Sequence, residues 1–225
     1  MENKKYELLD NDTVTTWDGR TLKRIRALVA IGSLVAAGEL GGYIESENNL
    51  SQVYGNAWVS GNAQVYGNAR VYGNAWVSGN AQVYGNAQVY GNARVSGDAW
   101  VSGDAWVSGN AQVYGNAQVY GNARVYGDAW VYGDAWVYGN AQVYGNARVE
   151  QRRDIFWLSI IGSENGTYTA FKNKDGGISV NRGCFHGTLE QFSDAVNERH
   201  TGQFHQEYQL VIELTKVRLG VGEAV

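Results

Sequence analysis

A unit of six residues is repeated sixteen times without interruption between Val53 and Arg148. The unit reads Val, Tyr or Ser, Gly, Asn or Asp, Ala, and then Trp, Gln or Arg. A short period of fixed length is typical of a solenoid, in which each unit contacts only its neighbours along the axis. We therefore expect a rod whose length follows from the number of units.

Alternation within each unit assigns its side chains to two sides of a short strand. Ala57 and Val59 point inward, whereas the residues that flank each Val, such as Trp58 and Ser60, point outward. Gly followed by Asn or Asp forms a corner, because Gly adopts positive φ freely and Asn and Asp tolerate it better than most residues. Strands and corners in alternation close a prism whose coils are stacked about 4.8 Å apart.

An aliphatic residue followed four places later by a small one resembles the motif of the hexapeptide-repeat family, the left-handed parallel β-helices. Each unit of the block, beginning with Val53 and Ala57, fits this motif. The resemblance implies three units per coil, about five coils and a left-handed winding. We expect a mostly β protein with three parts: an N-terminal β cap (1–52), a three-sided parallel β-helix (53–148) and a small C-terminal α+β unit (149–225).

The segments outside the repeat carry their own secondary-structure signals. Before it, residues 13–17 and 22–28 are expected to form two strands around the turn Asp18-Gly19, and residues 40–46 could be the first cap of the rod. After it, strands are expected at 155–161 and 167–171, with a turn at Gly176-Gly177.

A helix and a strand are expected near the C-terminus. Thr188 and Gln191 have the spacing of a capping box. Leu189, Phe192 and Val196 would then share one face of a helix that ends near Gly202. Beyond it, an alternation of apolar residues predicts a final strand, carried by Tyr208, Leu210, Ile212 and Leu214.

Three flanking stretches are similar to proteins carried by bacteriophages and prophages: residues 18–22, 40–46 and 183–192. In that group they bracket a variable number of hexapeptide units, and together with the repeat the resemblance covers nearly the whole chain. It implies a phage or prophage origin and names no mechanism.

The repeat contains a duplication. Residues 83–112 and 113–142 differ only where Ser96, Ser102 and Ser108 become Tyr126, Tyr132 and Tyr138. Thirty residues are five units, or one and two-thirds coils of a three-sided prism, so each copy is turned by one face relative to the other. A protein that binds ice or a crystalline polysaccharide needs one regular row of side chains on one face of the rod. Here Trp, Gln and Arg are scattered over all three faces, which favours a spacer or scaffold.

Composition excludes several classes of function. The chain has a net charge of −4, and Arg and Asp balance within the repeat, which argues against nucleic-acid binding. Proline is absent, and a single cysteine gives no disulfide framework and fits a reducing compartment. The start of the chain lacks an apolar signal core, and no segment is long enough to span a membrane. We therefore expect a location in the cytoplasm of a bacterial host, with no bound cofactor.

Catalysis is disfavoured. Hexapeptide-repeat acyltransferases use a His on the solenoid, often beside an inserted loop, but no His and no loop occur in the repeat. Cys184 and His186 would share a face of a strand and could form a nucleophilic pair, although no third group orients them. With His200 and His205 they lack the spacing of a metal site. The basic residues from Arg20 to Arg26 lie near acidic ones and favour a solvated hairpin face.

Outward aromatic residues are the unusual feature of the rod. Eleven Tyr and six Trp either stack between coils or form an interface, and the sequence leaves both readings open. The candidate binding residues are Trp58, Trp76, Trp100, Trp106, Trp130, Trp136, Tyr126, Tyr132 and Tyr138. We expect a non-catalytic binding or scaffold protein that forms a homo-oligomer (dimer or trimer) or inhibits a host protein. A glycan or small-ligand binder is the alternative, and an enzyme in the C-terminal unit is the third reading.

Overall fold

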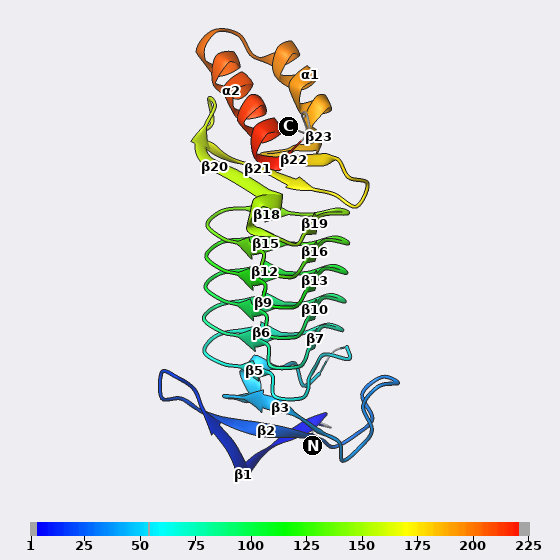
Figure 1. The fold of residues 1–225 in the computed structure, drawn as a ribbon. Coiled ribbons are helices and arrows are strands. Elements are labelled where there is room, and N and C mark those ends of the chain that lie inside the picture. The colour runs from blue at the N-terminus through cyan, green and yellow to red at the C-terminus, as the bar shows by residue number, and fades with distance from the viewer. Residues whose placement is uncertain (1–3, 54, 221–225) are drawn as a thin grey trace.

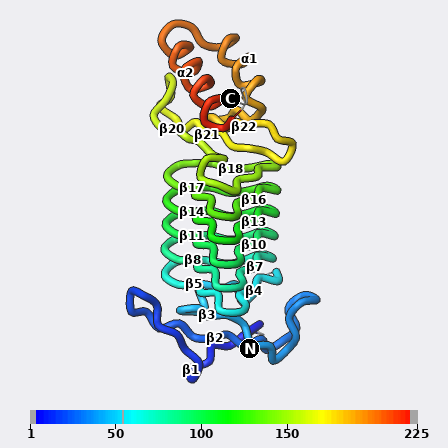
Figure 2. The backbone as a smooth tube through the Cα atoms, viewed as in Figure 1, coloured from blue at the N-terminus to red at the C-terminus, as the bar shows by residue number. Residues whose placement is uncertain are grey.

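The computed structural model describes residues 4–53 and 55–220. They form a straight rod with a β-rich cap at the N-terminal end and a unit of sheet and helices at the other end (Figure 1). The backbone winds through the rod in regular coils that lie directly above one another (Figure 2). The fold is therefore a mostly β, parallel-stranded solenoid between two flanking regions, as predicted.

The N-terminal cap is an antiparallel hairpin that continues into the rod. Strand β1 (Tyr6–Thr15) pairs with β2 (Thr21–Ala27), and β2 pairs with β3 (Leu40–Ile44). The predicted hairpin around Gly19 is confirmed. Strand β3 pairs on its other side with the rod in the parallel sense, so the cap and one rod face share a sheet.

Sixteen two-residue strands make up the rod within the described residues. Each consists of the sixth residue of one unit and the Val of the next. Strands that pair are eighteen residues apart, which gives three units per coil and three parallel faces. The first face holds β5 (Gln64–Val65), β8 (Gln82–Val83), β11 (Trp100–Val101), β14 (Gln118–Val119) and β17 (Trp136–Val137).

The other two faces repeat this arrangement. The second holds β4 (Trp58–Val59), β7 (Trp76–Val77), β10 (Arg94–Val95), β13 (Gln112–Val113), β16 (Trp130–Val131) and β19 (Arg148–Val149). The third holds β6 (Arg70–Val71), β9 (Gln88–Val89), β12 (Trp106–Val107), β15 (Arg124–Val125) and β18 (Gln142–Val143).

Val and Ala fill the interior of the rod, as the alternation predicts. From Ala57 to Val149, the Val and Ala of each unit are buried. Glycine is required at the corners for two reasons, a positive φ and a close contact with the next coil. Gly97 has φ +70°, and a Cβ there would lie 3.0 Å from the backbone nitrogen of Gly115 in the next coil.

The first unit departs from the prediction, because Val53 is 66% exposed. The inward place below Val71 is taken by Leu50, which is fully buried and bridges Val71 in the parallel sense. Leu50 and Val71 are 21 residues apart, not eighteen, and so are Ile44 and Val65. The coil that enters the rod therefore holds three extra residues, and a larger apolar side chain displaces the Val.

Both ends of the rod are closed. At the N-terminal end, Tyr6, Ile25 and Leu50 join the Val and Ala core. At the other end, Ile155 and Phe171 do the same, and they belong to paired strands of the C-terminal unit. An open solenoid end would expose apolar side chains and unpaired backbone groups, so both flanking regions act as caps.

The C-terminal unit is a four-stranded antiparallel sheet with two helices. The strands are β20 (Ile155–Ile161), β21 (Gly166–Lys172), β22 (Ile178–Arg182) and β23 (Phe185–Thr188), in that order. One face of the sheet covers the rod and the other packs against α1 (Leu189–Arg199) and α2 (Gly202–Leu219). Two 3₁₀ turns, Glu47–Asn49 and Arg152–Asp154, lie near the rod ends.

Helix α1 confirms the predicted capping box. Thr188 Oγ1 accepts a hydrogen bond from the Gln191 nitrogen at 3.2 Å, and Gln191 Oε1 accepts one from the Thr188 nitrogen at 2.9 Å. The buried residues of α1 are Leu189, Phe192 and Val196, as predicted.

The predicted final strand is wrong, because residues 202–219 form α2. Of the four alternating residues, Tyr208 and Ile212 are buried, whereas Leu210 and Leu214 are exposed. The buried set, which adds Val211, follows a helical spacing. The prediction failed because the exposed Leu210 and Leu214 lie two residues from buried positions, which gives the segment the alternating apolar pattern of a strand.

Candidate functional site

The outward tyrosines stack on one another along the rod. Tyr66 and Tyr84, eighteen residues apart, have ring centroids 5.1 Å apart and nearly parallel planes. Four further pairs have centroids between 4.9 and 5.5 Å apart: Tyr72–Tyr90, Tyr114–Tyr132, Tyr120–Tyr138 and Tyr126–Tyr144. These separations are close to the spacing of paired strands. Of the two interpretations of the outward aromatic residues, stacking between coils therefore accounts for these ten rings.

Three tryptophans in the C-terminal half of the rod are covered by arginines. The guanidinium of Arg124 lies 4.7 Å from the Trp106 ring centroid, and that of Arg148 lies 4.1 Å from Trp130. Arg152, just beyond the rod, covers Trp136 at 3.4 Å. Such cation–π contacts stabilise the surface by about 0.5–1 kcal/mol each and occupy ring faces that a ligand would otherwise use.

One predicted binding residue, Trp58, is not on the surface. It is fully buried, and its ring contacts Tyr6 of the cap edge-on with centroids 6.4 Å apart. Trp58 points outward from its strand, as alternation requires, but the N-terminal cap covers that position. Its indole Nε1 is buried without a hydrogen-bond partner among the described residues.

The remaining predicted residues lie on the surface without gathering into one site. Trp100 and Trp106 are exposed but occupy two different faces, and Tyr138 is exposed near the C-terminal unit. The others are half-buried: Trp76, Trp130, Trp136, Tyr126 and Tyr132. Among the described residues, the predicted binding residues are therefore spread over the rod and do not converge on one site.

The basic residues of the N-terminal hairpin are matched by carboxylates. Lys23 pairs with Asp10 at 2.6 Å, and Arg24 pairs with Asp12 at 2.6 Å. Arg20 and Arg26 are paired in the same way, with Asp18 and Glu45 and with Glu7. Each of these four basic side chains is therefore neutralised by a carboxylate.

Cys184 and His186 do not form a pair. Cys184 lies in the turn before β23 and lines a cavity of the C-terminal unit. His186 packs against the Tyr144 ring of the rod, with centroids 4.7 Å apart. In the described part of the chain, no group of three or more His, Cys, Asp or Glu side chains could hold a metal ion.

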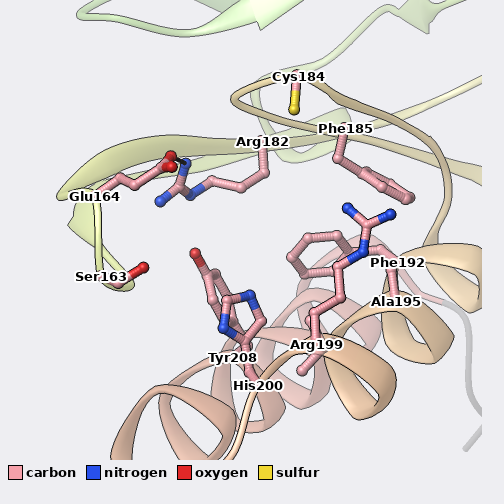
Figure 3. Close-up of a pocket in the computed structure, with 11 residues that line it drawn as sticks. Ser163, Glu164, Arg182, Cys184, Phe185, Phe192, Ala195, Arg199, His200 and Tyr208 are labelled. Atoms are coloured by element: carbon pink, nitrogen blue, oxygen red, sulfur yellow. Dashed lines mark ion pairs between the residues drawn. The ribbon is translucent and has the colours of Figure 1, made fainter.

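The cavity beside Cys184 has a volume of about 240 Å³ and lies between the sheet and the two helices (Figure 3). The turn after β20 contributes Ser163 and Glu164, the end of α1 contributes Arg199, and α2 contributes Tyr208. Sequence analysis considered two of the lining residues, Cys184 and His200, but did not predict the cavity, because its other side chains come from several elements and share no motif.

Arg182 is the buried charge of this cavity. Its side chain is 8% exposed; Nη2 donates to the Ile161 carbonyl oxygen at 2.9 Å, and Nη1 lies 3.6 Å from a Glu164 carboxylate oxygen. Nε has no hydrogen-bond partner among the described residues. Burial raises the pKa of the neighbouring Tyr208 further above neutral pH, so its phenol is protonated there.

Helix α2 carries an exposed aliphatic stripe on its outer side. Leu210, Leu214 and Val217 are 73%, 44% and 77% exposed, and they follow one another at intervals of four and three residues. That spacing places them on one face of the helix. Beside α2, edge strand β20 exposes Leu158 and Ile160, and Ile160 adopts φ +61°, which is unusual for a β-branched residue.

Fold and surface together define the class: a parallel β-solenoid repeat protein. Five stretches match a family model described as the YdcK β-solenoid repeat: residues 51–65, 63–79, 87–103, 117–133 and 141–153. The matches follow the rod. No curated protein matches the chain. No helix in the described part of the chain combines the length and apolar character needed to cross a membrane.

Proposed function

We propose that this protein is a non-catalytic scaffold of phage or prophage origin that acts through protein–protein contacts, first of all with a second copy of itself. The rod is a spacer, and the outer side of α2 is the contact surface. The aliphatic stripe of Leu210, Leu214 and Val217 carries the proposal, because exposed aliphatic side chains in a row usually mark an interface.

The charges beside the stripe favour a second copy as the occupant. Glu207 accepts a hydrogen bond from the Gly162 nitrogen, and the Arg218 guanidinium lies 5.6 Å from the Phe156 ring, so both are on the flank of α2 that faces β20. In a two-fold antiparallel pair of α2 helices, residues on the same flank meet. Glu207 of one copy then lies close to Arg218 of the other.

Other features support a role in binding over catalysis. The rod carries no His, and its strands follow one another at six-residue intervals without an inserted loop. The flanking stretches at residues 18–22, 40–46 and 183–192 support the phage or prophage origin. The tyrosine stacks stabilise the rod itself, which leaves α2 as the more favourable contact surface.

Sedimentation of the purified chain tests the proposal. We expect a concentration-dependent dimer that becomes a monomer in L210E/V217E, because a buried carboxylate pair disrupts an apolar interface. W100Q/W106Q is the matched control for the rod aromatics and should remain a dimer. A monomeric parent, or a dimer lost only in W100Q/W106Q, would overturn the proposal.

A further inference from the structure

The cavity of the C-terminal unit has an uneven charge distribution. Two guanidinium groups line it, those of Arg182 and Arg199, against the single carboxylate of Glu164. The Glu164 side chain is 79% exposed, and its 3.6 Å separation from Arg182 is long for an ion pair, so solvent weakens its effect. Arg199 forms no ion pair within the part of the chain that the structure describes. The cavity therefore has an excess of positive charge.

One part of the cavity wall is apolar and aromatic. Phe185 and Phe192 lie side by side at one end, with ring centroids 5.2 Å apart, and Ala195 and Val196 continue this surface along α1. Figure 3 shows the Arg199 side chain next to the two phenylalanine rings, with Arg182 and Glu164 on the opposite side. A ligand in this space meets an aromatic surface and a free guanidinium at once.

Neutral donors line the remaining side. The Tyr208 phenol stays protonated at neutral pH, and Ser163 adds a hydroxyl group. Arg182 is more than nine-tenths buried, and its Nε still lacks a partner among the described residues.

We infer that this cavity binds an organic carboxylate with a flat aromatic body. The aromatic body lies against Phe185 and Phe192, and the carboxylate is held by the Arg199 guanidinium, whose planar donors match carboxylate geometry. Arg182 and Tyr208 face the ligand from the other side and favour its negative charge. This inference is independent of the α2 interface, since the stripe lies on the opposite side of that helix.

Binding of phenylacetate to the full chain tests the inference, measured by calorimetry or by protein NMR shifts. Phenylacetamide has the same shape without the charge, and inorganic phosphate has charge without the ring; both should bind more weakly. N-acetylphenylalanine tests whether the terminal carboxylate of a peptide can be the source of the group. We expect saturable binding of at least one of the two aromatic carboxylates at millimolar concentrations.

Two substitutions complete the test. R199Q removes an exposed charge and should leave the fold intact, as circular dichroism can verify, while weakening carboxylate binding by about tenfold or more. R153Q removes another exposed arginine, outside the cavity, and should bind as the parent does. Failure of both carboxylates to bind, equal binding of phenylacetamide, or unchanged affinity in R199Q would each overturn the inference.

Discussion

The side-chain amide of Asn110 donates a hydrogen bond of 2.9 Å to Oδ1 of Asp128, which occupies the same corner one coil further along the rod. Corresponding bonds join Asn74 to Asn92 and Asn92 to Asn110, so an amide ladder runs along this corner. It ends at Asp128, because a carboxylate accepts hydrogen bonds but has no proton to donate. Each Asp in the repeat is thus an acceptor that ends a ladder.

Two substitutions of opposite sense test this ladder. N110D removes the donor and places two carboxylates in adjacent coils, so we expect a loss of about 1 kcal/mol at neutral pH. Their repulsion raises the pKa of the pair, and the penalty should therefore shrink as the pH falls and the pair takes up a proton. D98N adds a donor that can reach Asn116 and should raise the melting temperature slightly. Equal melting of N110D and D98N would contradict the ladder.

Val101 tests the interior of the rod. Its side chain is fully buried among Val and Ala, so V101D places an unpaired charge in an apolar core, and we expect a loss of about 3 kcal/mol or more. S102D, on the next residue, points outward and should change stability by less than about 1 kcal/mol. Denaturant unfolding of both variants measures the difference. A V101D variant that unfolds like the parent would refute the inward assignment.

Rod length is expected to be adjustable in whole units. Deletion of residues 113–130 removes one coil and keeps the facing of the C-terminal unit, whereas deletion of 113–142 turns that unit by one face relative to the N-terminal cap. Both should fold, because each coil contacts only its neighbours. In the parent chain, the ring centroids of Tyr138 and Trp157 are 4.4 Å apart. The longer deletion puts Ser108 in the place of Tyr138 and removes this contact, so that variant should be slightly less stable.

The same two deletions separate a spacer from a face-specific site. If self-association depends on α2 alone, both variants should dimerise as the parent does. Dimerisation of only the 113–130 deletion would mean that the contact surface extends onto the rod. If neither variant folds, the caps must depend on the length of the rod.

Tyr144 links the stability of the junction to alkaline pH. Burial raises the pKa of its phenol to about 12, and the hydroxyl donates to the Val180 carbonyl oxygen at 3.3 Å. A raised pKa in the folded state means that its contribution is fully present below the ordinary pKa of about 10 and is lost as the pH rises through 12. Y144F should therefore lose less stability than the parent between these values. The free energy of unfolding of both proteins, measured against pH, checks this. Identical pH dependence would show that deprotonation of Tyr144 does not affect the packing between the rod and the C-terminal unit.

Much of the architecture was predictable because the repeat states one local rule many times. Val101 and its equivalents alternate with outward-facing neighbours, and Gly97 marks a corner. The eighteen-residue pairing follows from the three units per coil that the resemblance to the hexapeptide-repeat family implies. The first coil, where the chain enters the rod, was less predictable. Leu50 competes with Val53 for one inward place, and only packing against Val71 and the cap decides between two apolar residues.

The sequence by itself determined the solenoid, its period and its inward residues, since these follow from short-range alternation and from the conformational freedom of glycine. Tertiary structure alone decided which surfaces remain free. It buries Trp58 beneath Tyr6, stacks the tyrosines between coils, and makes a helix of the segment that alternates from Tyr208. It also brings Arg182 and Arg199 to one cavity. Exposure depends on contacts between residues distant in the chain, and a local pattern does not record such contacts.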